Sequence, residues 1–205
     1  MLSKTRIAVL VSGGGTNLEA LLKAQEAGEI PHGEIVAVIS NVAGAYALQR
    51  AANHGVPGIT VVKKGVPQAE FEAQLSAALS EHKVELIVLA GFLSILSEDF
   101  VKQWPDRIVN VHPSLIPSFC GKGMYGLKVH KAALEKGVKV TGATVHLVNE
   151  IPDGGQILLQ KAVEILPEDT AETLQRRVME QAEWILLPRA AELLSQRIME
   201  EKENL

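Results

Sequence analysis

The sequence predicts an α/β fold: an open, mostly parallel sheet flanked by helices, with an antiparallel hairpin near the C-terminal part. Short β-branched runs alternate with segments of helical apolar spacing, which is the pattern of strand–helix–strand units. The segment 84–90, VELIVLA, is nearly all apolar, and a strand without a polar face is covered by helices on both sides. A glycine run follows the first strand, as in a Rossmann-like sheet.

The first unit is a strand, a glycine loop and a helix. The strand is expected at 6–11, where RIAVLV stops at a run of glycines. Thr16 and Glu19 are three residues apart, which predicts a capping box at the start of the helix. Gly28 suits the position just beyond the C-terminal end of that helix.

The same alternation predicts the remaining elements. Further strands are expected at 35–40, 59–62, 84–90 and 108–112, and further helices at 45–54, 67–82 and 129–136. Strands at 143–148 and 156–165 flank Asp153-Gly154, which indicates an antiparallel hairpin. A long amphipathic helix is expected at 169–201, with Pro188 as the point where it would break. Because no repeat or linker divides the chain, residues 1–205 are expected to form a single domain.

Composition and charge argue against several classes of protein. Twenty Lys and Arg against 24 Asp and Glu give a net charge of −4, and with 4% aromatic residues nucleic acid is a poor partner. The longest apolar stretch, 86–93, is far short of the ~20 residues that a membrane-spanning helix needs. Cys120 is the only cysteine, which excludes an internal disulfide and fits a reducing, cytoplasmic location. The spacing of the histidines predicts no metal site.

The glycine loop, Ser12 to Asn17, lies where parallel sheets bind anions, between the carboxyl end of a strand and a helix N-terminus. No Gly-Lys-Ser/Thr follows, so triphosphate binding is unsupported, and Leu18 replaces the third glycine of the dinucleotide pattern. The second strand ends at Asn41 without an acidic residue for a nicotinamide ribose. A single phosphate monoester is therefore expected; the alternative is a glycine turn that only reverses the chain.

Asn110 and His112 are two residues apart in a strand, so both side chains point to one face at its carboxyl end. An amide donor beside an imidazole suits stabilisation of an oxyanion together with proton transfer, as acyl or formyl transfer requires. The alternative is that Asn110 caps the following turn and His112 is a buried structural histidine. Asp153 by itself suits a hairpin turn. His146 alternates along a strand face that could approach the same cleft.

Four segments, in order along the chain, resemble those of phosphoribosylglycinamide formyltransferases, the folate-dependent enzymes of purine synthesis. Residues 11–18 (VSGGGTNL) are similar to the phosphate loop of that family, 89–96 (LAGFLSIL) to its folate segment, 110–117 (NVHPSLIP) to its signature and 153–155 (DGG) to its acidic loop. The Asn-x-His-Pro-Ser-Leu element is highly specific to enzymes that transfer formyl groups from folates. The resemblance covers most of the chain.

The resemblance implies transfer of a formyl group from 10-formyltetrahydrofolate, as co-substrate, to the amine of glycinamide ribonucleotide, without a metal. His112 would be the general acid and oxyanion partner, Asn110 a second donor, and Asp153 the carboxylate that holds His112 charged. The phosphate of the ribonucleotide would be bound by the glycine loop, at Gly14, Gly15, Thr16 and Asn17.

The implied folate contacts come from one segment and two separate residues: Leu93, Ser94, Ile95, Leu96, Asn110 and Gln68. The family usually has arginine where Ser94 stands and often where Gln68 aligns, so its usual contacts to the folate carboxylates are not expected here. The loop 120–126 is longer than the common pattern, and its glycines predict a mobile lid around Lys122. One residue is added near 179–183, so the ribose-binding glutamate of the family is Glu183 or Glu180, and Glu183 is favoured.

Three other functions share some of these features. A formyltetrahydrofolate deformylase, a hydrolase, shares the core, the histidine and the aspartate, but normally has an added N-terminal regulatory domain, whereas the first strand here starts at about residue 6. Methionyl-tRNA formyltransferase needs a further C-terminal domain, and the acidic balance argues against tRNA. A phosphate-binding regulatory module would not need Asn110, His112 and Asp153 together. The expected partners are two small-molecule substrates, without nucleic acid or membrane, in a monomer or weak homodimer.

Overall fold

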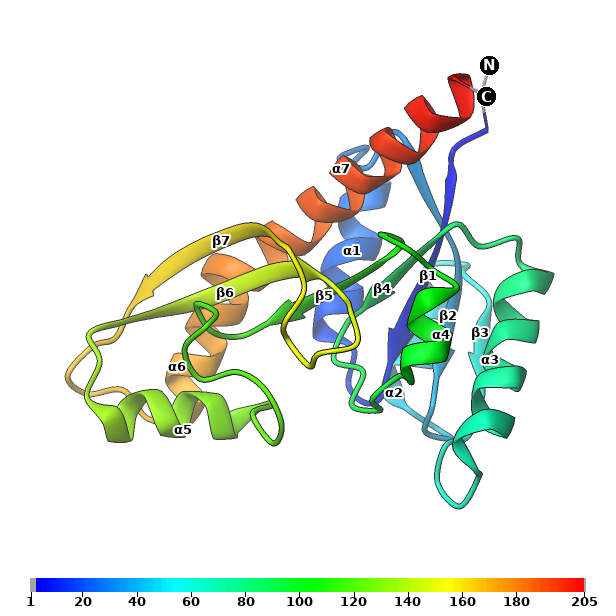
Figure 1. Cartoon of the computed structure of the whole chain (residues 1–205). Helices are drawn as coiled ribbons and strands as arrows, with labels where there is room; N and C mark the ends of the chain where they lie inside the picture. The colour runs from blue at the N-terminus through cyan, green and yellow to red at the C-terminus, as the bar shows by residue number, and fades with distance from the viewer. Residues whose placement is uncertain (1–2, 205) are drawn as a thin grey trace.

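The computed structural model describes residues 3–204, which form a seven-stranded sheet in the order β3-β2-β1-β4-β5-β6-β7 (Figure 1). The strands are β1 (Thr5–Val11), β2 (Gly33–Ser40), β3 (Gly58–Thr60), β4 (Leu86–Leu89), β5 (Ile108–His112), β6 (Val140–Leu147) and β7 (Ile157–Glu164). Strands β1 to β5 pair in parallel, whereas β6 pairs antiparallel with both β5 and β7. The predicted fold class, a mostly parallel sheet with an antiparallel hairpin in its C-terminal part, is confirmed.

Helices cover both faces of the sheet. One face is packed by α1 (Thr16–Glu26), α2 (Tyr46–Asn53) and α7 (Trp184–Glu203), and the other by α3 (Gln68–Glu81) and α4 (Glu98–Lys102). The remaining helices, α5 (Leu127–Lys136) and α6 (Ala171–Val178), pack against each other near β6 (Figure 1). No helix in residues 3–204 combines the length and the apolar character of a membrane span.

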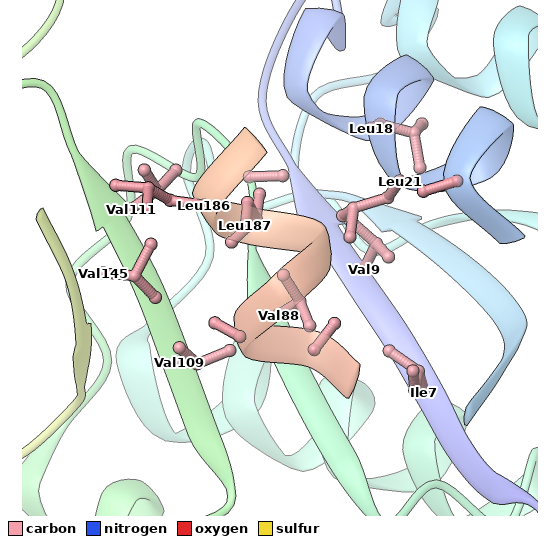
Figure 2. Close-up of a cluster of buried hydrophobic side chains, with 14 of the residues drawn as sticks. Ile7, Val9, Leu18, Leu21, Val88, Val109, Val111, Val145, Leu186 and Leu187 are labelled. Carbon is pink, nitrogen blue, oxygen red and sulfur yellow. The ribbon is translucent and has the colours of Figure 1, made fainter. Parts of the chain in front are cut away.

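The core is divided by the sheet into two hydrophobic layers. Neighbouring residues of β1 alternate between them: Val9 packs on the α7 side and Leu10 on the α3 side, and neither is exposed to solvent. Figure 2 shows Leu186 and Leu187 of α7 lying over the strands that carry Val9 and Val88. Full burial of such a side chain contributes about 1.5–3 kcal/mol, so the two layers fix α1 and α7 on the sheet.

The C-terminal segment differs from the single helix expected at 169–201. Helix α6 passes into a π-helical turn at Met179–Glu183 before α7 begins, and the chain continues without a break through Pro188, one turn into α7. A proline this close to the start of a helix removes one backbone hydrogen bond without ending the helix. The irregularity therefore lies upstream of Pro188, in the stretch where the sequence suggested an added residue. π-Helical turns of this kind occur often at functional sites.

Two local details also differ from expectation. The capping box of Thr16 and Glu19 is not formed: Gly15 is the N-cap in a left-handed conformation, and the Glu19 carboxylate pairs instead with Arg50 at 2.9 Å. Helix α4 was not expected, because its five residues are too few to show a helical period. Ser97 marks its start by accepting a hydrogen bond from the Phe100 N–H at 3.2 Å. The C-terminal end of α1 is as predicted, with Gly28 at φ +76°.

The hairpin between β6 and β7 closes on a glycine that no other residue can replace without movement. A Cβ at Gly155 would lie against the carbonyl oxygen of Leu147 and only 2.7 Å from its carbon. Gly155 directly follows Asp153 and Gly154, so its close approach to the Leu147 backbone fixes the position of the Asp153 loop.

We expect Gly155→Ala to lower the free energy of unfolding by about 1–3 kcal/mol, because the added methyl group overpacks against backbone that cannot rotate away. The matched control is Gly13→Ala, whose Cβ would meet no atom within 4 Å and whose φ is not positive. Urea denaturation of both variants measures the difference. Equal midpoints for the two variants would show that the hairpin tolerates the methyl group.

Candidate active site

The loops after β1, β4 and β5 meet at the carboxyl edge of the parallel strands and enclose a cavity of about 400 Å³. Its walls include the N-terminus of α1, the segment 91–95, the end of β5, the loop 121–126 and the π-helical turn. A cavity of about 350 Å³ along the glycine loop shares Thr16, Asn17 and Met179 with it. Another, of about 130 Å³, shares Asn110 and Asp153 with it. The three cavities therefore form one continuous cleft.

The glycine loop turns its open side toward this cleft. Gly15 has φ +73°, and a Cβ there would lie 2.7 Å from the Cβ of Ala47, so this glycine is needed for the approach of α2. At Gly13 and Gly14 a Cβ would meet nothing within 4 Å. From the outer side, Arg50 donates from Nε to the Gly14 carbonyl at 2.8 Å. The loop is thus held from behind and left open in front.

Asn17 and Glu183 connect the glycine loop to the π-helical turn. Asn17 donates from Nδ2 to Glu183 Oε2 at 2.7 Å, and both side chains are buried. Burial raises the pKa of the Glu183 carboxyl to about 7, although the hydrogen bond from Asn17 acts in the opposite direction. Glu183 lines the main cavity, whereas Glu180 is exposed on the turn and is not in the wall. Of the two glutamates that the sequence offered, Glu183 lies at the cleft.

Asn110, His112 and Asp153, to which the resemblance assigns the catalytic roles, all line the main cavity. Asp153 lies between two imidazoles: its Oδ2 is 3.6 Å from Nδ1 of His112, and its Oδ1 is 3.6 Å from Nε2 of His146. Asp153 has φ +57°, a left-handed conformation that aspartate tolerates better than most residues. The hairpin turn suggested by the sequence is therefore also what brings its carboxylate to His112.

The carboxyl of Asp153 stays ionised in spite of its burial. Burial by itself would raise its pKa. The contact with His146, the backbone N–H of Gly121 at 2.8 Å and the charge of His112 outweigh that effect, so the pKa of Asp153 lies below its ordinary value. A negative charge is thus present beside His112 throughout the neutral range.

His146 is the residue of this cluster that sequence reasoning undervalued. In the antiparallel register of β5 and β6 it lies directly opposite Asn110. Its Nδ1 donates to the Leu147 carbonyl at 2.8 Å, and its Nε2 lies 3.2 Å from Asn110 Nδ2 and 3.6 Å from Asp153 Oδ1. This orients the amide of Asn110. The signal in the sequence was the alternation of His146 along a strand face, but the register of β6 against β5 decides that it faces Asn110.

The loop after Pro117 contacts His112 and Asp153 through its backbone. Nε2 of His112 donates to the carbonyl oxygen of Phe119 at 2.9 Å, and the N–H of Gly121 donates to Asp153. Phe119 has φ +51°, an uncommon conformation for a bulky side chain. Residues 119–121 therefore touch both His112 and Asp153.

His130, on α5, is fully buried, and neither of its ring nitrogens has a hydrogen-bond partner within residues 3–204. Burial, followed by the charge of His112, lowers the pKa of His130 to about 4. It is therefore neutral at neutral pH and adds no positive charge near His112. Residues 3–204 contain no group of three or more His, Cys, Asp or Glu side chains that could hold a metal ion.

The segment 91–96, after β4, lines the cleft from the glycine-loop cavity to the smaller cavity. Leu93 and Ile95 are 62% and 66% exposed, which is unusual for large apolar side chains and indicates a contact surface. Ser94 accepts from Asn41 Nδ2 at 2.6 Å, and the Leu93 N–H donates to Ser12 Oγ at 2.8 Å. The smaller cavity lies between this segment, from Ser94 to Leu96, and residues 149–153.

Gln68 lies outside these three cavities, at the first turn of α3. Its amide donates to the Ile95 carbonyl at 3.1 Å and to Glu72 at 2.6 Å. In this structure Gln68 therefore supports the segment 93–96 from behind.

Comparison with known proteins agrees with this geometry. Residues 5–190 match the family of formyl transferases. The trifunctional purine biosynthetic protein adenosine-3 of Drosophila pseudoobscura pseudoobscura is 45% identical over 189 residues, which are 91% of this chain but 13% of that protein. The chain thus spans a small part of that relative's length.

Solved structures give the same result over a greater share of their length. Glycinamide ribonucleotide transformylase 1 from Symbiobacterium toebii is 40% identical, with a TM-score of 0.88 over 96% of this chain and 90% of that chain. A formyltetrahydrofolate deformylase from Burkholderia mallei is 28% identical, with a TM-score of 0.82 over 95% of this chain and 66% of that chain. With the family match and the transformylase agreeing over nearly all of the fold, this chain belongs to the formyl transferase family.

Proposed function

We propose that this protein transfers the formyl group of 10-formyltetrahydrofolate to the amine of glycinamide ribonucleotide. One observation carries the proposal: a single cleft joins an open glycine loop, suited to a phosphate, to Asn110, His112 and Asp153, suited to formyl transfer. The name of the Symbiobacterium toebii relative supports the choice of ribonucleotide. The deformylase relative, which is 28% identical, keeps hydrolysis as the alternative to be tested.

The substrates would lie along the cleft in a fixed order. The phosphate occupies the glycine loop at Gly14, Gly15, Thr16 and Asn17, and the ribose hydroxyls reach Glu183. The folate enters the cavity between 94–96 and 149–153, where backbone groups can hydrogen-bond a pterin edge and Leu93 and Ile95 cover its apolar surface. The formyl carbon then lies beside Asn110 and His112, between the two ends.

In the proposed reaction, the substrate amine attacks the formyl carbon and the carbonyl π electrons move to oxygen, which gives a tetrahedral oxyanion. Asn110 Nδ2 lies 3.2 Å from His146 Nε2, and as an amide nitrogen with two hydrogens it can donate one of them to that oxygen. Protonated His112 stabilises the oxyanion. The oxyanion then re-forms the carbonyl and the carbon–nitrogen bond to folate breaks. His112 gives its proton to the departing folate nitrogen, and the neutral imidazole takes the proton that the substrate amine loses, so His112 ends in its starting form.

Asp153 acts in this scheme by keeping His112 in its charged form. Its carboxylate faces Nδ1, while Nε2 is directed at the Phe119 carbonyl until substrate oxygen replaces it. Because the pKa of Asp153 is lowered, the negative charge is lost only when the pH falls below the ordinary range of a carboxyl.

The transferase is distinguished from the hydrolase by its need for an amine. We expect release of tetrahydrofolate from 10-formyltetrahydrofolate, followed by absorbance, to require glycinamide ribonucleotide and to give formylglycinamide ribonucleotide in equal amount. Release at the same rate without the amine, with free formate as product, would identify a deformylase instead.

We expect Asp153→Asn to lower kcat by about 10²–10⁴-fold near neutral pH, because the protonated imidazole of His112 loses its countercharge. The alkaline limb of the remaining activity should move to lower pH, since the charged ring is then lost at a lower pH. Steady-state rates between pH 5 and 9 measure both effects.

The control for this coupling is the double variant with His112→Ala. Residues that act as one unit give strongly non-additive losses, so the double variant should be little worse than either single variant. Additive losses, or an unmoved alkaline limb in Asp153→Asn, would leave Asp153 with only its hairpin role.

We expect Gly14→Val to weaken ribonucleotide binding at least tenfold while folate binding and stability stay near normal, because its side chain would fill the open front of the loop. Gly15→Val is the contrasting variant: its side chain would collide with Ala47 at a positive φ, so stability and both affinities should fall together. Calorimetry with each ligand and thermal unfolding separate the two cases. If Gly14→Val lowered the affinity for ribonucleotide and folate equally, the phosphate would not bind at this loop.

A further inference from the structure

The proposed phosphate end of the cleft lacks a positive charge. The cavity along the glycine loop is lined by Ser12 to Asn17 and by Ala90, Gly91, Leu93, Gln175 and Met179, none of which is ionisable. A phosphate monoester carries about −1.5 to −2 charges at neutral pH. The N-terminus of a helix such as α1 offers only about half of an elementary charge. The loop alone therefore leaves most of the phosphate charge without a partner.

Arg50 is near the loop but its charge is already used. It donates to the Gly14 carbonyl, pairs with Glu19 at 2.9 Å and lies 5.1 Å from the centre of the Tyr46 ring. The pocket that it lines, with Glu19 and Trp184, has a volume of about 270 Å³ and shares only Thr16 with the main cavity. Arg50 holds the loop from outside and is not in the wall of the cleft.

Lys122 is the lysine that lines the main cavity, together with Thr16 and Asn17 at the start of α1. It is exposed, and within residues 3–204 its ammonium makes no hydrogen bond or ion pair. Gly121 and Gly123 on either side both have φ +88°, and a Cβ at either would meet nothing within 4 Å. Lys122 is therefore a free cation on a loop with room to move.

We propose that Lys122 binds the phosphate of the ribonucleotide and closes the loop 121–126 over it, an inference that rests on the proposed function. The folate carboxylates are the other anions in that reaction. Lys122 lines neither the cavity between 94–96 and 149–153 nor the one along the glycine loop, but the main cavity that joins them, and the glycine-loop end is the one without an ionisable side chain in its wall. The wall that Lys122 shares with Thr16 and Asn17 favours the phosphate.

The position of Lys122 also relates phosphate binding to the reacting groups. The preceding residues, Phe119 and Gly121, contact His112 and Asp153 through their backbone. A phosphate that draws in Lys122 thereby orders the same loop that touches both groups. Binding energy from a part of the substrate that does not react is used in this way to position the reacting part.

The test compares Lys122→Met with Lys131→Met, a matched loss of one exposed lysine, on α5 and outside the cavity wall. Calorimetry measures the Kd of glycinamide ribonucleotide, of ribose 5-phosphate and of the unphosphorylated glycinamide riboside. We expect Lys122→Met to weaken both phosphorylated ligands about 10- to 100-fold, the size of a charge-assisted hydrogen bond, and the riboside less than twofold. Lys122→Arg should recover most of the affinity, and Lys131→Met should bind like the unchanged protein.

A second measurement follows the loop itself. Ribose 5-phosphate should slow chymotryptic cleavage after Tyr125 in the unchanged protein and not in Lys122→Met. Equal weakening of riboside and ribonucleotide, or loss confined to the folate, would overturn the proposal. The failure of this proposal can be told apart from the failure of the proposed function. Formyl transfer with phosphate binding that does not depend on Lys122 would refute only the role of Lys122. Binding of ribose 5-phosphate that depends on Lys122, without formyl transfer, would refute only the proposed reaction.

Discussion

The contacts of the half-buried Asp153 carboxylate are the interaction on which the centre of the cleft depends. The carboxylate touches two imidazoles on neighbouring antiparallel strands and accepts from the backbone of the loop after Pro117. A buried charge is costly unless it is paired and hydrogen-bonded, and here three elements supply the partners. The hairpin, the end of β5 and the loop 119–121 are thereby held in one arrangement.

The opposite end of the cleft is organised by packing and a single polar contact. The apolar layer under α1 and α7 sets the angle at which α1 leaves the glycine loop. The bond between Asn17 and Glu183 then joins that helix to the π-helical turn. Because a π-helical turn is wider than an α-helical one, it changes which side chains of the segment face inward. Glu183 faces the cleft for this reason, and under the proposed function it meets the ribose.

The two ends are connected through the exposed segment after β4. Its backbone is tied to the glycine loop at Ser12 and to the end of β2 at Asn41, while its apolar side chains remain uncovered. A rigid backbone with exposed Leu93 and Ile95 suits a surface that a planar ligand covers. This segment contains no arginine, so under the proposed function it would bind folate through shape and backbone groups. Lys122 is then the lysine in the wall of the cleft.

The sequence by itself determined the fold class and the order of the strands along the chain, because alternation, glycine turns and strand ends are local properties. Gly28, the hairpin and the pairing of Asn110 with His112 on one face could all be read from spacing. Tertiary structure decided what depends on contacts between distant residues: the choice of Glu183 over Glu180, the place of His146 beside Asn110, the support role of Gln68 and the loss of the Thr16 capping box to Arg50. These outcomes follow from strand register and helix packing, which bring together groups 27 to 166 residues apart, and no local pattern records them.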